Sequence, residues 1–367
     1  MRHGRLVGWS ALLVALALGA CDQGGSVRAP LKPVPAKPAA PAQANPALTA
    51  VTAINQAQLV ATIAPPAPDA GQAPETPQPV IVKAEVLLAR AHASPGVIDG
   101  LAGSNLARAV KAYEAMAGLP ADGELSPAVW GKLTSQGPAP AASVYTITPQ
   151  DVAGPFYPDY GENMVAASKL PATGYADPAE ELAARFHMSE ALLQALNPGE
   201  DFTHAGAVIA VVRPEVEALA SVAHVEVDKA AASVRAYDSQ GALIASFPAT
   251  VGSTEKPSPK GEHKVVDIQF NPLYTYDPAK LTWGPRRHGR FTIKPGPNNP
   301  VGVVWIGLNA PGYGIHGSPN PDRIGKTASH GCVRLTNWDA ATLAAALKPG
   351  TEVDFVRERG QASAAES

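Results

Sequence analysis

The residues of this chain that could do chemistry gather in one stretch, Ser329 to Asn337, which reads SHGCVRLTN. It contains Cys332, one of only two cysteines among 367 residues, and a histidine, His330, near it. A second histidine, His316, lies shortly upstream. A free thiol has a pKa of about 8.5, but a nearby imidazole can take its proton and leave a thiolate that attacks carbonyl carbon. Glycine at position 331 would let a substrate backbone come close and leave backbone N–H groups to hold an oxyanion.

The order of these residues resembles the active-site signature of the L,D-transpeptidases, whose catalytic domain is of the YkuD type. The matching string is His316-Gly317, an intervening loop, then Ser329-His330-Gly331-Cys332-Val333-Arg334-Leu335 and Asn337. The resemblance implies that Cys332 attacks a peptidoglycan stem-peptide carbonyl and forms a thioester acyl-enzyme. It assigns the general base and proton donor to His316, titrating near neutral pH, and not to His330. A structural cysteine in a loop is the alternative, because most cysteines are small buried hydrophobes.

The other residues of the string have roles that the resemblance and their chemistry suggest. Arg334 can grip a substrate carboxylate with two hydrogen bonds, or hold the loop through an internal ion pair. The Gly317 carbonyl can hold one ring nitrogen of His316 and fix its tautomer. His330 and Gly331 would shape the loop or an oxyanion pocket. The predicted substrate contacts are Ser329, Arg334, Asn337 and Tyr313, where Asn337 also fits a cap or loop brace and Tyr313 also fits packing.

Three functions compete for these residues. The first is transfer of the acyl group to an amine, which gives cell-wall crosslinks or attaches a protein or amino acid. The second is hydrolysis of stem peptides on the same scaffold, as an L,D-carboxypeptidase or amidase, since water and amine would use the same acyl-enzyme. The third is a non-catalytic peptidoglycan-binding anchor, against which the intact set of Cys332, His316 and Arg334 argues. The sequence leaves the first two open.

Length and composition narrow the partners. At about 150 residues per domain, 367 residues suggest two or three domains. The formal net charge is -3, and no basic stripe interleaved with aromatic residues is present, so nucleic acid is not an expected partner. No His-x-x-x-His pair lies near a carboxylate, so neither a metal nor another cofactor is expected. The expected partners are peptidoglycan stem peptides and glycan, together with an acceptor protein if the acyl group goes to one.

The N-terminus has the pattern of an export signal. A basic start is followed by an apolar run over 6–18, which is shorter than the roughly 20 residues of a membrane span. Its end, Leu18-Gly19-Ala20-Cys21, resembles a bacterial lipobox and implies a lipoprotein signal peptide over 1–21 with Cys21 lipidated. An ordinary signal peptide is the alternative. The expected location is the periplasmic face of a bacterial membrane, with the inner membrane slightly favoured over the outer because Asp22 follows.

Two segments are expected to lack fixed structure. Residues 22–79 are dominated by Ala and Pro, which favour extended chain and cannot support a packed core, so they predict a disordered linker. Within it, residues 50–63 could be transiently helical. The polar tail over 358–367 is predicted to be disordered as well.

Residues 80–135 carry apolar side chains at helical spacing, interrupted by the turns Asp99-Gly100 and Asp122-Gly123. With the pair Tyr113-Glu114, these turns resemble the peptidoglycan-binding type 1 module, which implies three short helices. The apolar faces are read as core, and whether the module binds glycan or peptide stays open.

Residues 145–214 predict two helices, at 180–184 and 188–196, and a strand over 206–212. The segment looks like a degenerate LysM module, of α/β type, in which the expected Gly-Asp-Thr-Leu is replaced by Ala179-Glu180-Glu181-Leu182. The segment could bind sugar, and a packing role beside the catalytic domain fits its sequence at least as well. The positions that match the family are Leu182, Ala183, Phe186, Leu192, Leu193, Leu196, Asn197 and Gly206.

The catalytic domain is expected over 222–357, where apolar residues alternate with a period of two and predict strands. A helix is predicted over 338–347, with Asn337 as its cap, and a last strand over 351–356. The expected fold class is therefore multidomain α+β. A small helical peptidoglycan-binding module and a LysM-like α/β segment precede a β-rich, sandwich-like L,D-transpeptidase domain with its site at one rim.

Overall fold

The computed structural model describes residues 45–66, 76–157, 160–161, 163–253, 257–279, 284–327, 329 and 331–356. The chain divides into two units, Met1–Gln43 and Ala44–Ser367, and all described residues belong to the second. Cys21 with the expected signal peptide, the tail over 358–367 and His330 lie outside the described residues. None of the described helices is long and apolar enough to span a bilayer.

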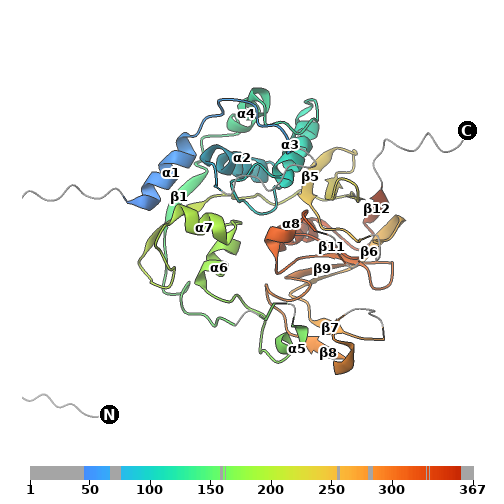
Figure 1. Ribbon diagram of the computed structural model, residues 1–367. Helices are drawn as coiled ribbons and strands as arrows, with labels where there is room; N and C mark the ends of the chain where they lie inside the picture. Colours follow the sequence, from blue (N-terminus) through green and yellow to red (C-terminus); the bar gives the residue numbers. More distant parts are fainter. Residues whose placement is uncertain are drawn as a thin grey trace, which may run out of the picture. The chain divides into compact units, whose positions relative to one another are not determined.

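Three helices, α2 (Pro79–Arg90), α3 (Ser104–Ala117) and α4 (Pro127–Thr134), form the first module (Figure 1). Proline opens α2 and α4, where its missing N–H costs no helical hydrogen bond. The helices share a core that includes Leu88, Leu106 and Leu133. The predicted three-helix module is therefore confirmed.

Both Asp-Gly turns of this module are tied to buried carboxyl groups. The Gly100 N–H donates to Glu85 Oε2 at 2.8 Å, and the Gly123 N–H donates to Glu114 Oε2 at 2.8 Å. Burial raises the pKa of Glu114 to about 7, against the opposing effect of the Gly123 hydrogen bond. Burial, with the charge of Asp99, raises the pKa of Glu85 well above its usual value. Each turn thus closes over a carboxyl group whose protonated form is favoured.

The helix α1 (Pro46–Gln56) corrects the sequence analysis, which predicts a disordered linker over 22–79. Proline occurs only at the start of this helix, and the Asn45 side chain caps it by accepting from the Ala47 N–H at 3.0 Å. Ile54 is 1% exposed and lies in the core beneath the middle segment. The linker prediction is therefore wrong for residues 46–56, because one apolar face of the helix is buried by the rest of the protein.

The middle segment consists of β1 (Ala142–Thr146), the short helix α5 (Met164–Ala167), the helices α6 (Pro178–Arg185) and α7 (Glu190–Leu196), and β2 (Val208–Val212). β1 and β2 pair antiparallel, and α6 and α7 lie between them in the chain. The two predicted helices and the strand at 206–212 are confirmed, whereas the sequence analysis did not predict β1. The Asn197 side chain links α7 to β2, since it donates to the Ala210 carbonyl at 2.9 Å and accepts from the Ala210 N–H at 2.6 Å.

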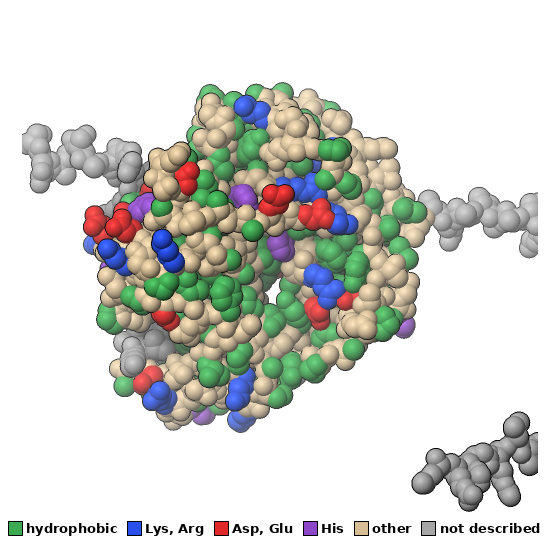
Figure 2. Space-filling view, turned by 180° about the vertical axis from the view of Figure 1, so that it is seen from behind, with side chains coloured by type: hydrophobic (Ala, Val, Ile, Leu, Met, Phe, Trp, Pro, Cys, Tyr) green, Lys and Arg blue, Asp and Glu red, His purple; other side chains and the backbone are tan. Residues whose placement is uncertain are grey.

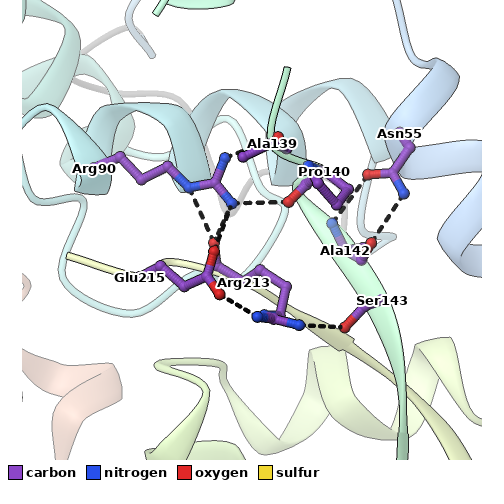
Figure 3. Close-up of polar contacts among 8 residues, drawn as sticks. All are labelled: Asn55, Arg90, Ala139, Pro140, Ala142, Ser143, Arg213 and Glu215. Atoms are coloured by element: carbon purple, nitrogen blue, oxygen red, sulfur yellow. Dashed lines mark hydrogen bonds and ion pairs between the residues drawn. The ribbon is translucent and has the colours of Figure 1, made fainter. Parts of the chain in front are cut away.

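Arg90, at the end of α2, fastens the helical module to the middle segment (Figure 3). Its guanidinium donates to the carbonyl oxygens of Arg213 at 2.6 Å, Pro140 at 2.8 Å and Ala139 at 3.0 Å. The backbone N–H of Ala142 in turn donates to the Asn55 side chain at 3.0 Å, which attaches α1 to β1. These contacts lie on the side of the module that faces the middle segment.

An eight-stranded sheet forms the catalytic domain, in the order β11-β10-β9-β6-β12-β3-β4-β5. Its last strand in the chain, β12, lies inside the sheet, parallel to β3 and antiparallel to β6. The strands are β3 (His224–Asp228), β4 (Ser233–Tyr237), β5 (Leu243–Pro248), β6 (Gly261–Phe270), β9 (Val304–Leu308), β10 (Gly314–His316), β11 (Val333–Arg334) and β12 (Glu352–Val356). Further elements are the hairpin of β7 (Tyr274–Tyr276) and β8 (Phe291–Ile293), the 3-10 turns η1 (Arg286–His288) and η2 (Pro321–Arg323), and the helix α8 (Asn337–Ala346).

The sheet is curled so that its two edges nearly meet. The chain leaving β5 at one edge reaches β11 at the other, where the Thr250 N–H and carbonyl exchange hydrogen bonds of 2.9 Å with Arg334. β6 makes the bend possible, because its first half pairs with β12 and its second half with β9, with an irregularity between Val265 and Asp267. The α+β fold class is therefore confirmed. The two layers that the sequence analysis expects of a sandwich are formed by the two halves of one curled sheet, which enclose a shared core.

The helical module packs against the β5 edge of the sheet. Residue Ala93 forms a parallel bridge with Ser246 of β5, in which the Ser94 N–H donates to the Ser246 carbonyl at 2.9 Å. The Ser94 hydroxyl also donates to Asp339 Oδ2 of α8 at 3.0 Å. The surface seen from behind is hollowed near its centre, and basic and acidic side chains are interspersed beside the hollow (Figure 2). No single sign of charge dominates that face.

Candidate active site

Two short neighbouring strands bring the predicted cysteine, histidine and arginine together. β10 and β11 are parallel, with Ile315 opposite Val333 and His316 opposite Arg334, and Cys332 immediately precedes β11. Because side chains alternate between the two faces of a sheet, Arg334 and Cys332 point to the same face as His316. The pairing therefore places a thiol, an imidazole and a guanidinium side by side at the edge of the sheet.

His316 is held in one orientation. It is 4% exposed, its ring stacks on Trp305 of β9 with centroids 5.6 Å apart, and its Nδ1 lies 2.7 Å from the Gly317 carbonyl oxygen. A carbonyl can only accept, so Nδ1 carries the proton and Nε2 keeps a lone pair. The contact with Gly317 that the sequence analysis expects is present, and it leaves Nε2 as the basic atom.

Burial makes both reacting groups neutral. It lowers the pKa of His316 to about 3, and the charge of Arg334 lowers it further in the same direction, while the hydrogen bond to Gly317 opposes this. Burial also raises the pKa of the Cys332 thiol, against the Gly314 N–H and the charge of Arg334. The expectation that His316 titrates near neutral pH is therefore wrong, because desolvation disfavours the imidazolium. At neutral pH the site holds a thiol and an uncharged imidazole.

Glycines surround the sulfur. Cys332 Sγ lies 3.7 Å from the Gly312 carbonyl oxygen. By the register, Gly314 stands opposite Cys332, and a Cβ there would come within 2.7 Å of the Trp305 ring. Gly331, before the cysteine, has a φ of +116°, which a residue with a side chain rarely adopts. Gly314 therefore allows the Trp305 ring to pack closely against the strand opposite Cys332.

Ser329 braces the loop from inside. It is 3% exposed, its hydroxyl donates to the Cys332 carbonyl at 2.5 Å, and it accepts the Gly331 N–H at 3.2 Å. Its own N–H donates to the Val251 carbonyl at 2.8 Å. These contacts favour a structural role over the substrate contact expected for Ser329. They also engage the N–H of Gly331, the residue that the sequence analysis expects to shape the loop or an oxyanion pocket.

Asn337 is a brace and not the cap of α8. The cap is Thr336, whose hydroxyl accepts the Asp339 N–H at 3.2 Å, so that part of the prediction is wrong. Asn337 Oδ1 accepts the N–H groups of Val303 and Ser318, both at 3.1 Å, and its amide also donates to the Pro297 carbonyl at 3.0 Å. Asn337 thus joins the start of β9 to the residues that follow His316, as the loop-brace alternative predicts.

Two tyrosines lie beside these groups. Tyr313, expected to line the cleft, is partly buried between Gly312 and Gly314 in the turn that approaches the sulfur. Tyr274 of β7 was not predicted. Its hydroxyl is buried without a hydrogen-bond partner among the described residues, and its pKa is raised to about 12, first by burial and then by the charge of an ionised Cys332. A buried tyrosine next to the nucleophile has no local sequence signal beyond the alternation of β7.

Comparisons with known proteins find the family resemblance over the same parts of the chain. The family model of the L,D-transpeptidase catalytic domain matches residues 223–355, and that of a peptidoglycan binding domain matches residues 78–133. A Bacillus licheniformis protein assigned as L,D-transpeptidase YkuD is 30% identical over 178 residues, which cover 48% of this chain and 92% of that protein. An Escherichia coli K12 protein, named as the probable L,D-transpeptidase YbiS, is 28% identical over 54% of this chain and 65% of its own length. A solved L,D-transpeptidase of Xylanimonas cellulosilytica is 17% identical, covering 79% of this chain and 100% of that one, with a TM-score of 0.34.

Proposed function

Because this chain belongs to the L,D-transpeptidase family, we propose that it is a cysteine-dependent acyltransferase acting on peptidoglycan stem peptides. The observation that carries the proposal is the pairing of β10 with β11, which sets Cys332, His316 and Arg334 on one face of the sheet. A nucleophile, a fixed base and a cation for a carboxylate are the groups that acyl transfer between peptides requires.

In the acylation step, Cys332 Sγ attacks a carbonyl carbon of the donor stem peptide. The thiol proton passes to His316 Nε2, and the carbonyl oxygen becomes an oxyanion. Collapse of this intermediate breaks the C–N bond, and His316 returns the proton to the leaving amine. The product is a thioester between Cys332 and the shortened donor.

In the transfer step, an acceptor amine attacks the thioester carbonyl. His316 Nε2 takes a proton from that amine and gives it to the leaving Cys332 sulfur, which restores the resting thiol. Arg334 would hold a stem-peptide carboxylate during both steps, since guanidinium can bind it with two parallel hydrogen bonds. Water in place of the amine would give hydrolysis by the same route.

The low pKa of His316 keeps Nε2 unprotonated, and it also makes the imidazole a weaker base than an ordinary histidine. An imidazole that is neutral throughout the physiological range is always able to accept the thiol proton. The raised pKa of Cys332 means that the thiolate forms as the carbonyl is attacked and not beforehand. The resting thiol is thereby less exposed to adventitious oxidation than a preformed thiolate would be.

We also propose the cellular setting from sequence. Lipidation of Cys21 would hold the protein at the periplasmic face of a membrane, with the inner membrane slightly favoured. The helical module would contact glycan or stem peptide, and the LysM-like segment is a further candidate for sugar binding. Cell fractionation tests the anchor, because Cys21→Ala should move the protein from membranes to the soluble fraction, and a wild type that is already soluble would refute it.

The experiment for the activity is incubation of the purified protein with a stem tetrapeptide, followed by mass spectrometry. A crosslinked dimer that has lost one terminal residue is expected if the acyl group goes to an amine. Tripeptide alone would identify a hydrolase, and unchanged tetrapeptide with no thioester on Cys332 would reject the proposal. Cys332→Ala protein, treated in parallel, is the control.

A further inference from the structure

The second helix of the module, α3, holds the segment that leads to the nucleophile through Asn105 and Arg108. Asn105 Nδ2 donates to the Ile324 carbonyl at 3.0 Å, and Arg108 Nη2 donates to the Gly325 carbonyl at 3.0 Å. A third contact joins Asp99 Oδ2 to Lys326 Nζ at 3.3 Å. Three successive residues of the catalytic domain, shortly before Cys332, are thus held by the helical module.

The two side chains form a prearranged clamp. Asn105 is 9% exposed, and its Oδ1 accepts a hydrogen bond from Arg108 Nη1. Arg108 Nη1 also donates to the Ser104 hydroxyl at 3.3 Å, so the guanidinium is fixed on its own helix before it meets Gly325. Burial lowers the pKa of Arg108, which reflects a cation partly withdrawn from water. Hydrogen bonds to a desolvated cation are stronger than those between neutral groups.

Gly325 is fitted to this clamp. Its φ is +73°, and a Cβ there would come within 2.5 Å of Asn105 Oδ1 and 3.1 Å of Arg108 Nη1. Both the backbone conformation and the close approach therefore require glycine. Ile324, beside it, is 1% exposed, so the gripped segment is also anchored in the protein interior.

From Gly325 the hydrogen bonds continue to the reacting groups. The Gly325 N–H donates to the Thr250 hydroxyl at 3.1 Å, and the Thr250 backbone pairs with Arg334. The next residue, Val251, accepts the Ser329 N–H at 2.8 Å. The loop that carries Cys332 is therefore fixed at both ends by residues 250–251, and the segment that precedes it is held by α3.

We propose that Asn105 and Arg108 are positioning residues for the Cys332 loop, so that the helical module is a structural part of the active site. This inference rests on the proposed function and deepens it. A module that only tethered the enzyme to the cell wall would need no contact with the loop. Displacement of a reacting group by about 1 Å can cost about a hundredfold in rate, so loss of one loop contact is expected to matter for chemistry.

The chain offers a matched control in Arg90. Like Arg108, it is an arginine of the helical module that donates to backbone carbonyls of another segment, but its acceptors are Ala139, Pro140 and Arg213, away from the Cys332 loop (Figure 3). Arg108→Met and Arg90→Met each remove a guanidinium and keep an apolar stem. Both should lower the melting temperature, which makes stability a shared effect.

The test compares these variants in a Cys21→Ser background, where Cys332 is the one thiol in the sequence. In Arg108→Met we expect kcat to fall about tenfold or more with KM within about twofold, and the pH profile of Cys332 alkylation by iodoacetamide to shift. Arg108→Lys should recover part of kcat, since one donor returns. Arg90→Met should leave both readouts at the wild-type level, and Asn105→Ala should change them in the same direction as Arg108→Met.

A wild-type kcat and alkylation profile in folded Arg108→Met would overturn the proposal, as would equal losses in Arg90→Met. If Arg108→Met does not fold, the comparison of Asn105→Ala and Arg108→Lys with Arg90→Met decides in the same way. Alkylation needs no peptide transfer, so it also separates the two proposals. A wild type that transfers nothing would reject the enzyme activity, while an alkylation profile that shifts only in the α3 variants would still support positioning.

Discussion

The helical module and the catalytic rim both bury ionisable groups, and in each region backbone groups form hydrogen bonds with them. In the module, Glu85 and Glu114 accept the N–H groups of Gly100 and Gly123. In the rim, His316 donates to the carbonyl of the next residue along the chain. Burial favours the neutral form in each case, so the carboxyl pKa values rise and the imidazole pKa falls.

The difference lies in what remains after that hydrogen bond is made. Each buried carboxyl closes a turn, and the Asp and Gly residues that shift its pKa belong to that same turn of its own module. The imidazole uses Nδ1 for orientation and keeps Nε2 for the thiol on the next strand. Burial with one hydrogen bond therefore stabilises structure in one region and prepares a base in the other.

The largest effect expected is at Cys332, which has no counterpart in the module. Cys332→Ala should abolish acyl-enzyme formation and leave thermal unfolding nearly unchanged, because a small side chain on a rim loop leaves little cavity. Cys332→Ser should be almost as inactive, since a hydroxyl is far less acidic than a thiol. Intact-mass spectrometry after incubation with donor peptide measures the thioester, and wild-type acylation in Cys332→Ala would refute the assignment.

His316→Ala should lower the acylation rate on the order of a hundredfold or more, the usual scale of general base catalysis. In the wild type, activity should persist at mildly acidic pH and decline through this group only as pH falls toward about 3. The folded-state pKa lies below the unfolded value, so stability from neutral His316 is present above about pH 6.5 and is lost as pH falls toward 3. His330→Ala should cost less, and a greater loss there than in His316→Ala would reverse the two roles.

Glu114→Gln should change the free energy of unfolding and leave activity unchanged, because Glu114 holds a turn of the helical module and is not one of the reacting groups. The folded pKa is raised to about 7, so the protonated carboxyl stabilises the fold below about pH 4.5, and this contribution is lost as pH rises to 7. Glutamine keeps an acceptor without the charge, so the variant lacks this loss. Its free energy of unfolding should match wild type near pH 4.5 and exceed it by about 1 to 3 kcal/mol at pH 7.5. Urea unfolding at pH 4.5 and 7.5 measures it, and a gain that is independent of pH would contradict the explanation.

The smallest effect is expected where the two regions meet. Ser94→Ala removes the hydroxyl that donates to Asp339, a carboxyl whose pKa burial raises to about 7. The loss should be about 1 kcal/mol in the free energy of unfolding, the usual net value of one hydrogen bond, with kcat unchanged. A tenfold drop in kcat would show that this contact, and not only the one at Arg108, bears on the Cys332 loop.

What the sequence could predict depends on how local each feature is. His316, Cys332 and Arg334 lie on or beside two adjacent short strands, β10 and β11. The pairing of these strands brings the side chains together, and the family resemblance already implies this. For the α1 helix the sequence predicts only a transient helix over 50–63 within a disordered linker, because Ala and Pro dominate its surroundings. Ile54 is buried in a core that later segments supply. The positions of Tyr274 and of the Asn105–Arg108 clamp depend on contacts between distant parts of the chain, which no local pattern records. The pKa of His316 likewise follows from burial that only the folded sheet creates.

The place of β12 in the sheet has a consequence for the order of folding. This strand lies between β3 and β6, so the hydrogen bonds that join β3 to β6 through it form only when residues 352–356 pair. Joining β3 to β12 closes a loop that spans the whole catalytic domain, and such non-local pairing slows folding. Insertion of this last strand is therefore expected to be a late step in assembling the sheet that carries Cys332.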